Sequence, residues 1–95
     1  MNVEIFRKIP GFEIYSICEN GKTIGTKKKT ELKPIKSELQ WYVDFNINGK
    51  QLRKKIAELV AITFLPNPKN HKYIKFKDGE PSNYHKKNLT FLIIP

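Results

Sequence analysis

Residues 73–92, YIKFKDGEPSNYHKKNLTFL, decide the fold of this chain. They divide into a short strand, an Asp78-Gly79 turn, a polar loop that contains Asn83 and Asn88, and a return strand. Aspartate followed by glycine favours a turn, because the aspartate side chain bonds nearby backbone and glycine tolerates positive φ. The stretch also carries four of the chain's lysines, namely Lys75, Lys77, Lys86 and Lys87.

The segment before this stretch contains the clearest secondary-structure pattern. Apolar residues alternate with polar ones from residue 41 to 47, which predicts a half-buried strand. Asn48-Gly49 then turns the chain. A two-residue loop pairs Phe45 with Leu52 on the buried face and Asp44 with Arg53 on the other face. The same register points Lys54 inward, where we expect a bulge or a strand end.

A short amphipathic helix follows this hairpin. Pro66 ends this helix. The residues of its packing face recur at helical spacing and are Ile56, Leu59, Val60, Thr63 and Phe64. Residues 67–71 read as a loop. The first 26 residues read as short strands around turns, with a two-residue hairpin at Asn20-Gly21 and a return strand over residues 23–25. Pro34 argues against a central strand at its position. These elements predict an α+β fold, a small domain rich in β-hairpins with one short amphipathic helix.

The net charge of +9 is unevenly distributed. Residues 1–26 hold three basic and three acidic residues, so the whole excess lies in residues 27–95. Such asymmetry favours a polyanionic partner, and nucleic acid is the commonest candidate, although solubility alone also explains a basic surface. Only Arg7 and Arg53 are arginines. Lysine contacts phosphate as a point charge, whereas bidentate recognition of guanine prefers arginine, so base-specific recognition is not what this composition indicates.

Length and composition place further bounds on the protein. Ninety-five residues suffice for one domain with a modest core. No apolar run is long enough for a membrane span and the N-terminus does not begin a signal peptide, so we expect a cytoplasmic protein (host cytoplasm if viral) without a membrane partner. The single cysteine, Cys18, is expected to pack as a small apolar group. His71 and His85 lack the spacing of a zinc site, and we expect no cofactor and no metal.

Residues 73–92 resemble the motif of HNH homing endonucleases, whose usual wording is close to "v-N-H-i-D-G-d-x-x-N-N-x-x-x-N-L-x-W". Asp78-Gly79, Asn83 and Asn88-Leu89 fall in register with it, and Phe91 takes the place of the aromatic residue. The resemblance implies that the chain ends in a truncated hairpin of the ββα-metal type. It also implies that the two asparagines hold the loop by hydrogen bonds to the backbone.

The rest of the chain is similar to the same family. The stretch FRKIPGFEIYSICENGKTIGTKKK resembles the nuclease-associated modular domain (NUMOD type) that precedes many HNH endonucleases, and LVAITFLPNP, residues 59–68, resembles its "L-V-A-x-x-F-x-P-N-P". We therefore divide the chain into a modular segment, 1–26, and an HNH-like segment, 27–95, which together form one compact domain.

Departures from the family pattern fall on its catalytic positions. The general-base histidine is Phe76, its polar neighbour is Lys75, and a further histidine position is Ala57. A phenyl ring accepts no proton from water, and an ammonium group repels a divalent metal. The helix that completes a working HNH unit would lie beyond Pro95. The resemblance thus implies a degenerate scaffold, and we expect that the chain is not an enzyme.

The leading hypothesis is a non-catalytic nucleic-acid-binding protein, encoded by a phage or virus, that binds DNA in preference to RNA. Its candidate contacts are basic residues of the connector (residues 27–36), of the hairpin after it and of residues 73–92. They are Lys27, Lys28, Lys29, Lys33, Lys36, Arg53, Lys54, Lys55, Lys75, Lys77, Lys86 and Lys87. An alternative is a basic protein-interaction or assembly subunit of a viral particle or ribonucleoprotein, or an inhibitor of a host enzyme, anchored by exposed aromatics such as Tyr42, Tyr73, Tyr84 or Phe76. A third is a composite nuclease whose missing ligands come from a partner chain.

Overall fold

Three small antiparallel sheets and one α-helix form the part of the chain that the structure describes, residues 4–66 and 73–92 of a computed structural model. The strands are β1 (Arg7–Ile9), β2 (Phe12–Ile17), β3 (Thr23–Gly25), β4 (Ile35–Ser37), β5 (Gln40–Ile47), β6 (Lys50–Lys55), β7 (Tyr73–Phe76) and β8 (Leu89–Leu92). The helix α1 (Ile56–Phe64) follows β6 directly, and a 3-10 helix (Lys86–Asn88) precedes β8. Antiparallel strands with one helix agree with the α+β class that the sequence predicts.

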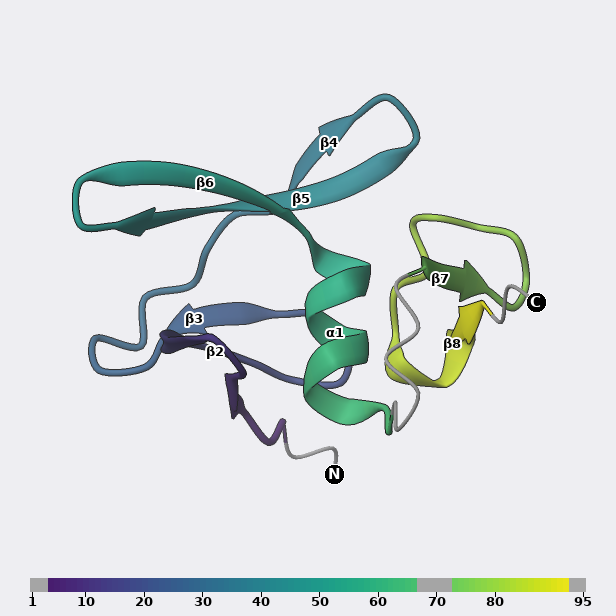
Figure 1. Ribbon diagram of the computed structural model, residues 1–95, viewed down its shortest axis with the longest axis horizontal. Coiled ribbons are helices and arrows are strands. Elements are labelled where there is room, and N and C mark those ends of the chain that lie inside the picture. The colour runs from purple at the N-terminus through teal and green to yellow at the C-terminus, as the bar shows by residue number, and fades with distance from the viewer. Residues whose placement is uncertain (1–3, 67–72, 93–95) are drawn as a thin grey trace.

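Helix α1 lies at the centre of the molecule, with the sheets around it (Figure 1). The sheets have the strand orders β1-β2-β3, β4-β5-β6 and β7-β8, and α1 contacts strands from all three. The buried residues of the helix pack with those of the strands in one cluster, whose members are Ile9, Ile17, Val43, Phe45, Ile56, Ala57, Leu59, Val60 and Leu89. The core therefore joins the beginning, middle and end of the chain.

Helix α1 begins and ends where the apolar spacing predicts. Its last residue is Phe64, and Leu65 is already extended, with φ −101° and ψ 133°. The residue before a proline is disfavoured in helical conformation, so Pro66 accounts for this end. The loop expected at residues 67–71, including His71, lies outside the described residues.

The hairpin of β5 and β6 has the predicted register. Phe45 pairs with Leu52 and Asp44 pairs with Arg53, and the turn residues Asn48 and Gly49 have φ values of 53° and 79°. Positive φ at both positions is what a type I′ turn requires, and this turn matches the twist of the strands. The sequence prediction of this hairpin is confirmed.

Two details of the hairpin differ from expectation. No bulge occurs at Lys54: the pairing continues to Lys55, and the Lys54 ammonium lies 5.2 Å from the centroid of the Phe12 ring. Attraction between the cation and the ring face lets this lysine point inward without a strand end. Leu52 is 39% exposed although its partner Phe45 is fully buried, so the predicted burial of Leu52 is wrong.

The turn between β2 and β3 is longer than the predicted two-residue hairpin. Strand β2 ends at Ile17 and β3 begins at Thr23, so residues 18–22 form the connection. Only Gly21 has positive φ there, at 92°, while the Asn20 side chain accepts a hydrogen bond from the Lys22 amide at 3.0 Å. An asparagine that bonds the backbone two residues on replaces the expected type I′ geometry.

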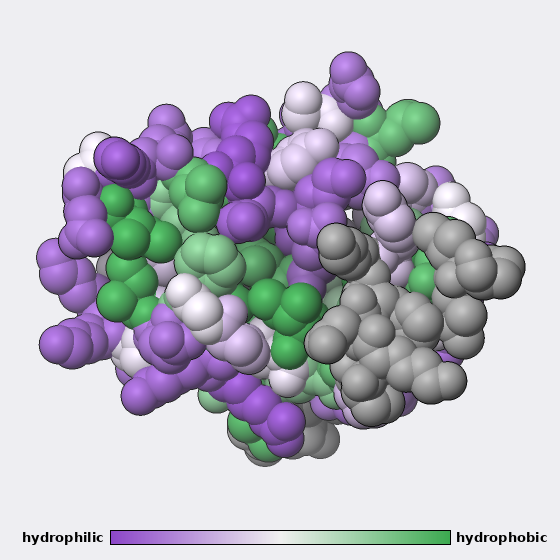
Figure 2. Space-filling view, in the orientation of Figure 1, coloured by the Kyte–Doolittle hydropathy of each residue, from purple (hydrophilic) through white to green (hydrophobic). Residues whose placement is uncertain are grey.

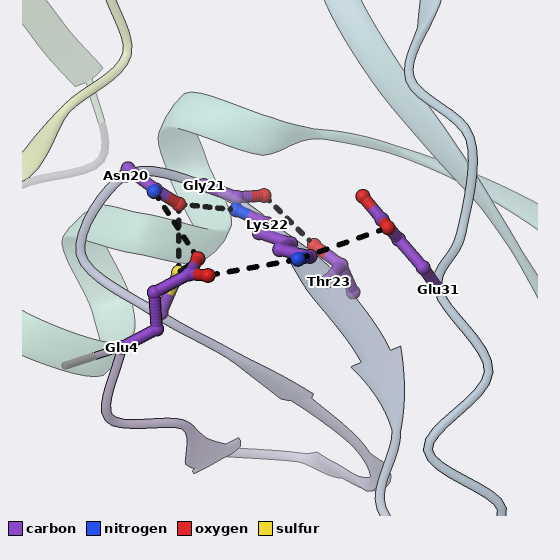
Figure 3. Close-up of polar contacts among 7 residues, drawn as sticks. Glu4, Asn20, Gly21, Lys22, Thr23 and Glu31 are labelled. Atoms are coloured by element: carbon purple, nitrogen blue, oxygen red, sulfur yellow. Dashed lines mark hydrogen bonds and ion pairs between the residues drawn. The ribbon is translucent and has the colours of Figure 1, made fainter.

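A polar cluster links Glu4 to this turn and to Glu31, which follows β3 (Figure 3). Asn20 donates to Glu4 Oε2 at 3.3 Å, and the Lys22 ammonium lies 3.6 Å from Glu4 and 3.9 Å from Glu31. Cys18 is buried beneath them, and its thiol donates to Asn20 Oδ1 at 2.7 Å. Burial raises the pKa of this thiol, which agrees with a packing role for the cysteine.

Candidate nucleic-acid interface

Strands β7 and β8 present one face to the core and the other to solvent. Phe76 pairs with Leu89, and both residues belong to or pack against the buried cluster. Lys75 alternates with Phe76 and is exposed opposite Thr90. Phe76, which the sequence resemblance aligns with a histidine, thus packs inward as an apolar group, while its neighbour Lys75 faces solvent.

The polar loop between these strands is held by Asp78, Asn83 and Asn88. Asn83 Nδ2 donates to Asp78 Oδ2 at 2.8 Å, and Asn88 Nδ2 donates to Asp78 Oδ1 and to the Asn83 carbonyl, both at 2.8 Å. The Glu80 amide also donates to Asp78 Oδ1, at 2.8 Å. These donors favour the carboxylate, with Asn83 the largest influence, and hold the pKa of Asp78 below its usual range. These bonds confirm a structural role for both asparagines, but only Asn88 bonds the backbone as predicted, whereas the Asn83 side chain bonds the Asp78 carboxylate.

An open hollow of about 360 Å³ lies beside this loop. It is lined by Asn83, His85, Lys87 and Asn88. The His85 ring is oriented by a hydrogen bond in which Nδ1 accepts from the Lys87 amide at 3.1 Å. His85 was not among the predicted contacts, and no local pattern identifies it, because its position depends on how the long loop folds back onto β8.

Most of the predicted basic contacts are exposed. Ten of the twelve face solvent, whereas Lys54 and Lys86 are half-buried. The connector residues Lys27, Lys28 and Lys29 lie in a turn that is closed by a bond from the Lys29 amide to the Gly25 carbonyl, and all three side chains project outward. Lys29 has φ 59° in this turn. In Figure 2, hydrophilic residues occupy most of the outline of the face shown, and apolar residues gather between them.

Some of the predicted contacts are already paired with acidic side chains. Arg53 donates two hydrogen bonds to Asp44, from Nε at 2.8 Å and from Nη2 at 3.1 Å. This guanidinium holds the pKa of Asp44 below its usual range. The Lys86 ammonium lies 3.3 Å from Glu19 Oε1. These two cations are less available to phosphate than the connector lysines, for which the described residues show no ion pair.

The aromatics proposed as exposed anchors differ in position. Tyr73 is 60% exposed, but Tyr42, Tyr84 and Phe76 are half-buried, so the expectation fails for these three. Lys36 lies over the ring of Trp41, at 5.9 Å from its centroid.

Within the described residues, no group of three or more His, Cys, Asp or Glu side chains is close enough together to hold a metal ion, and no helix is long and apolar enough to span a membrane.

Comparison with known proteins gives one informative match. No protein-family model and no curated protein sequence matches the chain. Among solved structures, the HNH homing endonuclease I-HmuI, from a study of DNA binding and cleavage, is similar with a TM-score of 0.83 and 23% sequence identity. The match covers 93% of this chain and 52% of that one, so the chain spans about half the length of the solved endonuclease.

This match corrects the expectation that the chain is not an enzyme. That expectation used the absence of a helix after Pro95, yet the similar chain extends over about twice the matched length and its study describes cleavage. Nothing in the described residues shows that activity is lost. The expectation is therefore wrong as stated. Over nearly its whole length, the chain has the fold of an HNH homing endonuclease.

Proposed function

We propose that this chain is a nucleic-acid-binding unit related to HNH homing endonucleases, with DNA as its ligand. In this proposal, residues 1–26 correspond to the nuclease-associated modular segment and residues 27–95 to the HNH-like segment, and the source is a phage or virus. The observation that carries the proposal is the row of exposed connector lysines, Lys27–Lys29, on a fold shared with an endonuclease from a study of DNA binding.

The charges of the surface support backbone contact more than base recognition. The one arginine of the hairpin, Arg53, already forms a bidentate pair with Asp44, which occupies the geometry that guanine recognition requires. Apart from Arg7, whose guanidinium lies over the Phe64 ring, the exposed cations that remain are lysines, which bind phosphate as point charges. We therefore expect binding with a steep salt dependence and weak sequence preference.

The test compares two variants that lose the same charge. Lys27→Gln with Lys28→Gln removes two exposed connector cations, whereas Lys22→Gln with Lys86→Gln removes two cations that are paired with Glu4, Glu31 and Glu19. Fluorescence anisotropy with a DNA duplex is measured from low to moderate salt, and a single-stranded RNA serves as the second ligand. The slope of log affinity against log salt should fall by about 0.9 for each lost phosphate contact in the connector variant.

Three results would contradict the proposal. Absence of duplex binding by the wild-type protein at low salt removes it entirely. Equal slopes for the two double variants would show that net charge, and not the connector, determines affinity. Tighter binding of the RNA than of the duplex would contradict the choice of DNA. Circular dichroism of each variant checks that the fold is retained.

A second candidate function is protein binding, and one observation favours it. Tyr73 and Leu92 are cross-strand partners on β7 and β8, and they are 60% and 41% exposed. Paired exposed apolar side chains of this kind are typical of interface anchors. A stoichiometric protein that co-purifies after nuclease treatment, and that is lost with Tyr73→Ser, would support this role. Co-purification that disappears on nuclease treatment would contradict it.

A further inference from the structure

We propose that the hollow lined by Asn83, His85, Lys87 and Asn88 seats one phosphate group of the nucleic-acid backbone, with neutral His85 and cationic Lys87 as its two donors. The proposal rests on the proposed function and adds to it a defined subsite and a residue, His85, that charge patterning does not identify. Three features of the hollow carry it: the tautomer of the histidine, the hydrogen bonds that hold the asparagines, and the absence of a carboxylate from its lining residues.

The hydrogen bond at His85 assigns its tautomer. Nδ1 accepts from the Lys87 amide at 3.1 Å, so Nδ1 carries a lone pair and, in the neutral ring, the proton is on Nε2. The ring is half-buried and lines the hollow. The Nε2–H of His85 is therefore the donor left for a ligand, and the acceptor lone pair on Nδ1 is already used by the Lys87 amide. This geometry suits an anion.

The asparagines of the hollow are engaged within the protein. Asn88 Nδ2 already donates twice, to Asp78 and to the Asn83 carbonyl, and Asn88 Oδ1 accepts from the Asp78 amide at 3.1 Å. Asn83 Nδ2 donates to Asp78 at 2.8 Å. These bonds hold the wall in place and occupy the Asn88 amide, whereas exposed Asn83 uses one Nδ2 hydrogen. The donors that the hollow offers to an anion are therefore the His85 Nε2–H, the Lys87 ammonium and the second Nδ2 hydrogen of Asn83.

The charge of the hollow is positive. Lys87 is exposed and has no carboxylate within 4.0 Å in residues 4–66 and 73–92, unlike Lys86, whose ammonium lies 3.3 Å from Glu19. The Asp78 carboxylate does not line the hollow, and it accepts three hydrogen bonds, from Glu80, Asn83 and Asn88, which stabilise its charge within the loop. One cation and one neutral imidazole donor match a phosphodiester, which carries one negative charge and accepts hydrogen bonds only.

Binding experiments with single substitutions test the two donors separately. Lys87→Gln should lower the slope of log duplex affinity against log salt by about 0.9, because one ion contact is lost. His85→Phe should weaken binding roughly tenfold at fixed salt without changing that slope, because a neutral hydrogen bond to a charged group is lost. His85→Gln, which retains a donor, should recover part of this loss. Lys50→Gln is the matched control, since Lys50 is an exposed lysine at the start of β6 and does not line the hollow.

The outcomes separate this proposal from the proposed function. Wild-type protein that binds no duplex overturns both. A second result overturns only the phosphate seat. In that result the wild-type protein binds duplex with a steep salt slope, but Lys87→Gln behaves like Lys50→Gln, or His85→Phe binds as tightly as wild type. Nitrogen-15 NMR of the wild-type imidazole gives a measurement that needs no variant: a protonated Nε2 whose signal shifts on duplex addition supports the proposal, and a protonated Nδ1 in the neutral ring overturns it.

Discussion

The ring of Tyr84 lies directly against Gly21. A Cβ atom at Gly21 would clash with this ring and would lie 2.9 Å from Ile56 Cγ2. The contact joins the turn between β2 and β3 to the polar loop of residues 73–92, and it is reinforced by a bond from the Lys86 amide to the Glu19 carbonyl at 2.8 Å. The first and last parts of the chain are thus packed against each other with no room for a side chain between them.

Gly21→Ala should destabilise the protein by about 2–4 kcal/mol, because it adds both steric crowding and a residue at φ 92°. Urea unfolding measures the change. Gly49→Ala shares positive φ, at 79°, but has no atom within 4 Å of the added Cβ, so it should cost only about 1–2 kcal/mol. Gly25→Ala has neither problem and should change stability by less than about 0.5 kcal/mol. Equal effects at positions 21 and 49 would show that the Tyr84 contact contributes nothing.

Tyr15→Phe should destabilise the protein by about 1 kcal/mol. The Tyr15 hydroxyl accepts from the Asn46 amide at 2.9 Å and donates to the Asn46 carbonyl at 3.3 Å, in the part of β5 that β4 does not pair with. The ring also stacks on Phe45 with centroids 4.2 Å apart, and Phe preserves this contact. Tyr15→Leu should therefore cost more than Tyr15→Phe in thermal or urea unfolding. No loss with Tyr15→Phe would mean that water replaces the hydroxyl at this edge.

Asp78→Asn should make the stability of the protein less sensitive to acid. The pKa of Asp78 is lowered in the folded state from an ordinary value of 3.8, so its contribution is complete above that value and disappears as the pH falls through the folded pKa. We expect the variant to be less stable than wild type at neutral pH, with a difference that narrows below pH 3.8. Unfolding curves between neutral pH and the acid limb measure it. A difference that stays constant with pH would contradict the assignment.

Asp44→Asn should strengthen duplex binding by roughly threefold to tenfold at low salt. Asp44 holds Arg53 through two hydrogen bonds, so its neutralisation removes a negative charge from the basic surface and releases the guanidinium for phosphate. The slope against salt should become steeper in the same titration. Glu13→Gln removes one exposed carboxylate that lies in no ion pair among the described residues, and it is the control for net charge. Equal gains for the two variants would exclude a particular role for Arg53.

Local patterns in the sequence account for the hairpin and the helix. Asn48-Gly49 specifies a type I′ turn, the alternation of residues 41–47 specifies the buried face, and together they lead to the observed pairing of Asp44 with Arg53. Pro66 likewise specifies the end of α1. These predictions succeed because each depends on residues adjacent in the chain, whose backbone preferences act before any tertiary contact forms.

Local patterns failed where distant segments supply the contact. Lys54 has no bulge because Phe12, which lies 42 positions earlier, offers its ring to the ammonium. The partial burial of Phe76 and Tyr84 and the exposure of Leu52 also depend on which segment covers each side chain. An ion pair such as Lys86 with Glu19 joins residues separated by 67 positions, and no spacing rule identifies it.

Residues 73–92 show, in one stretch, what the local sequence predicts and what it does not. The sequence by itself determined the turn at Asp78-Gly79, the structural part played by Asn83 and Asn88, and the resemblance that the shared endonuclease fold then supported. Only the tertiary structure decided that Phe76 packs inward, that Lys86 is paired while Lys87 is exposed, and that His85 lines a hollow with Nδ1 bonded to the Lys87 amide. The reason is physical: turn formation depends on the φ preferences and short-range bonds of neighbouring residues, whereas burial, pairing and tautomer depend on partners that the folded chain brings from elsewhere.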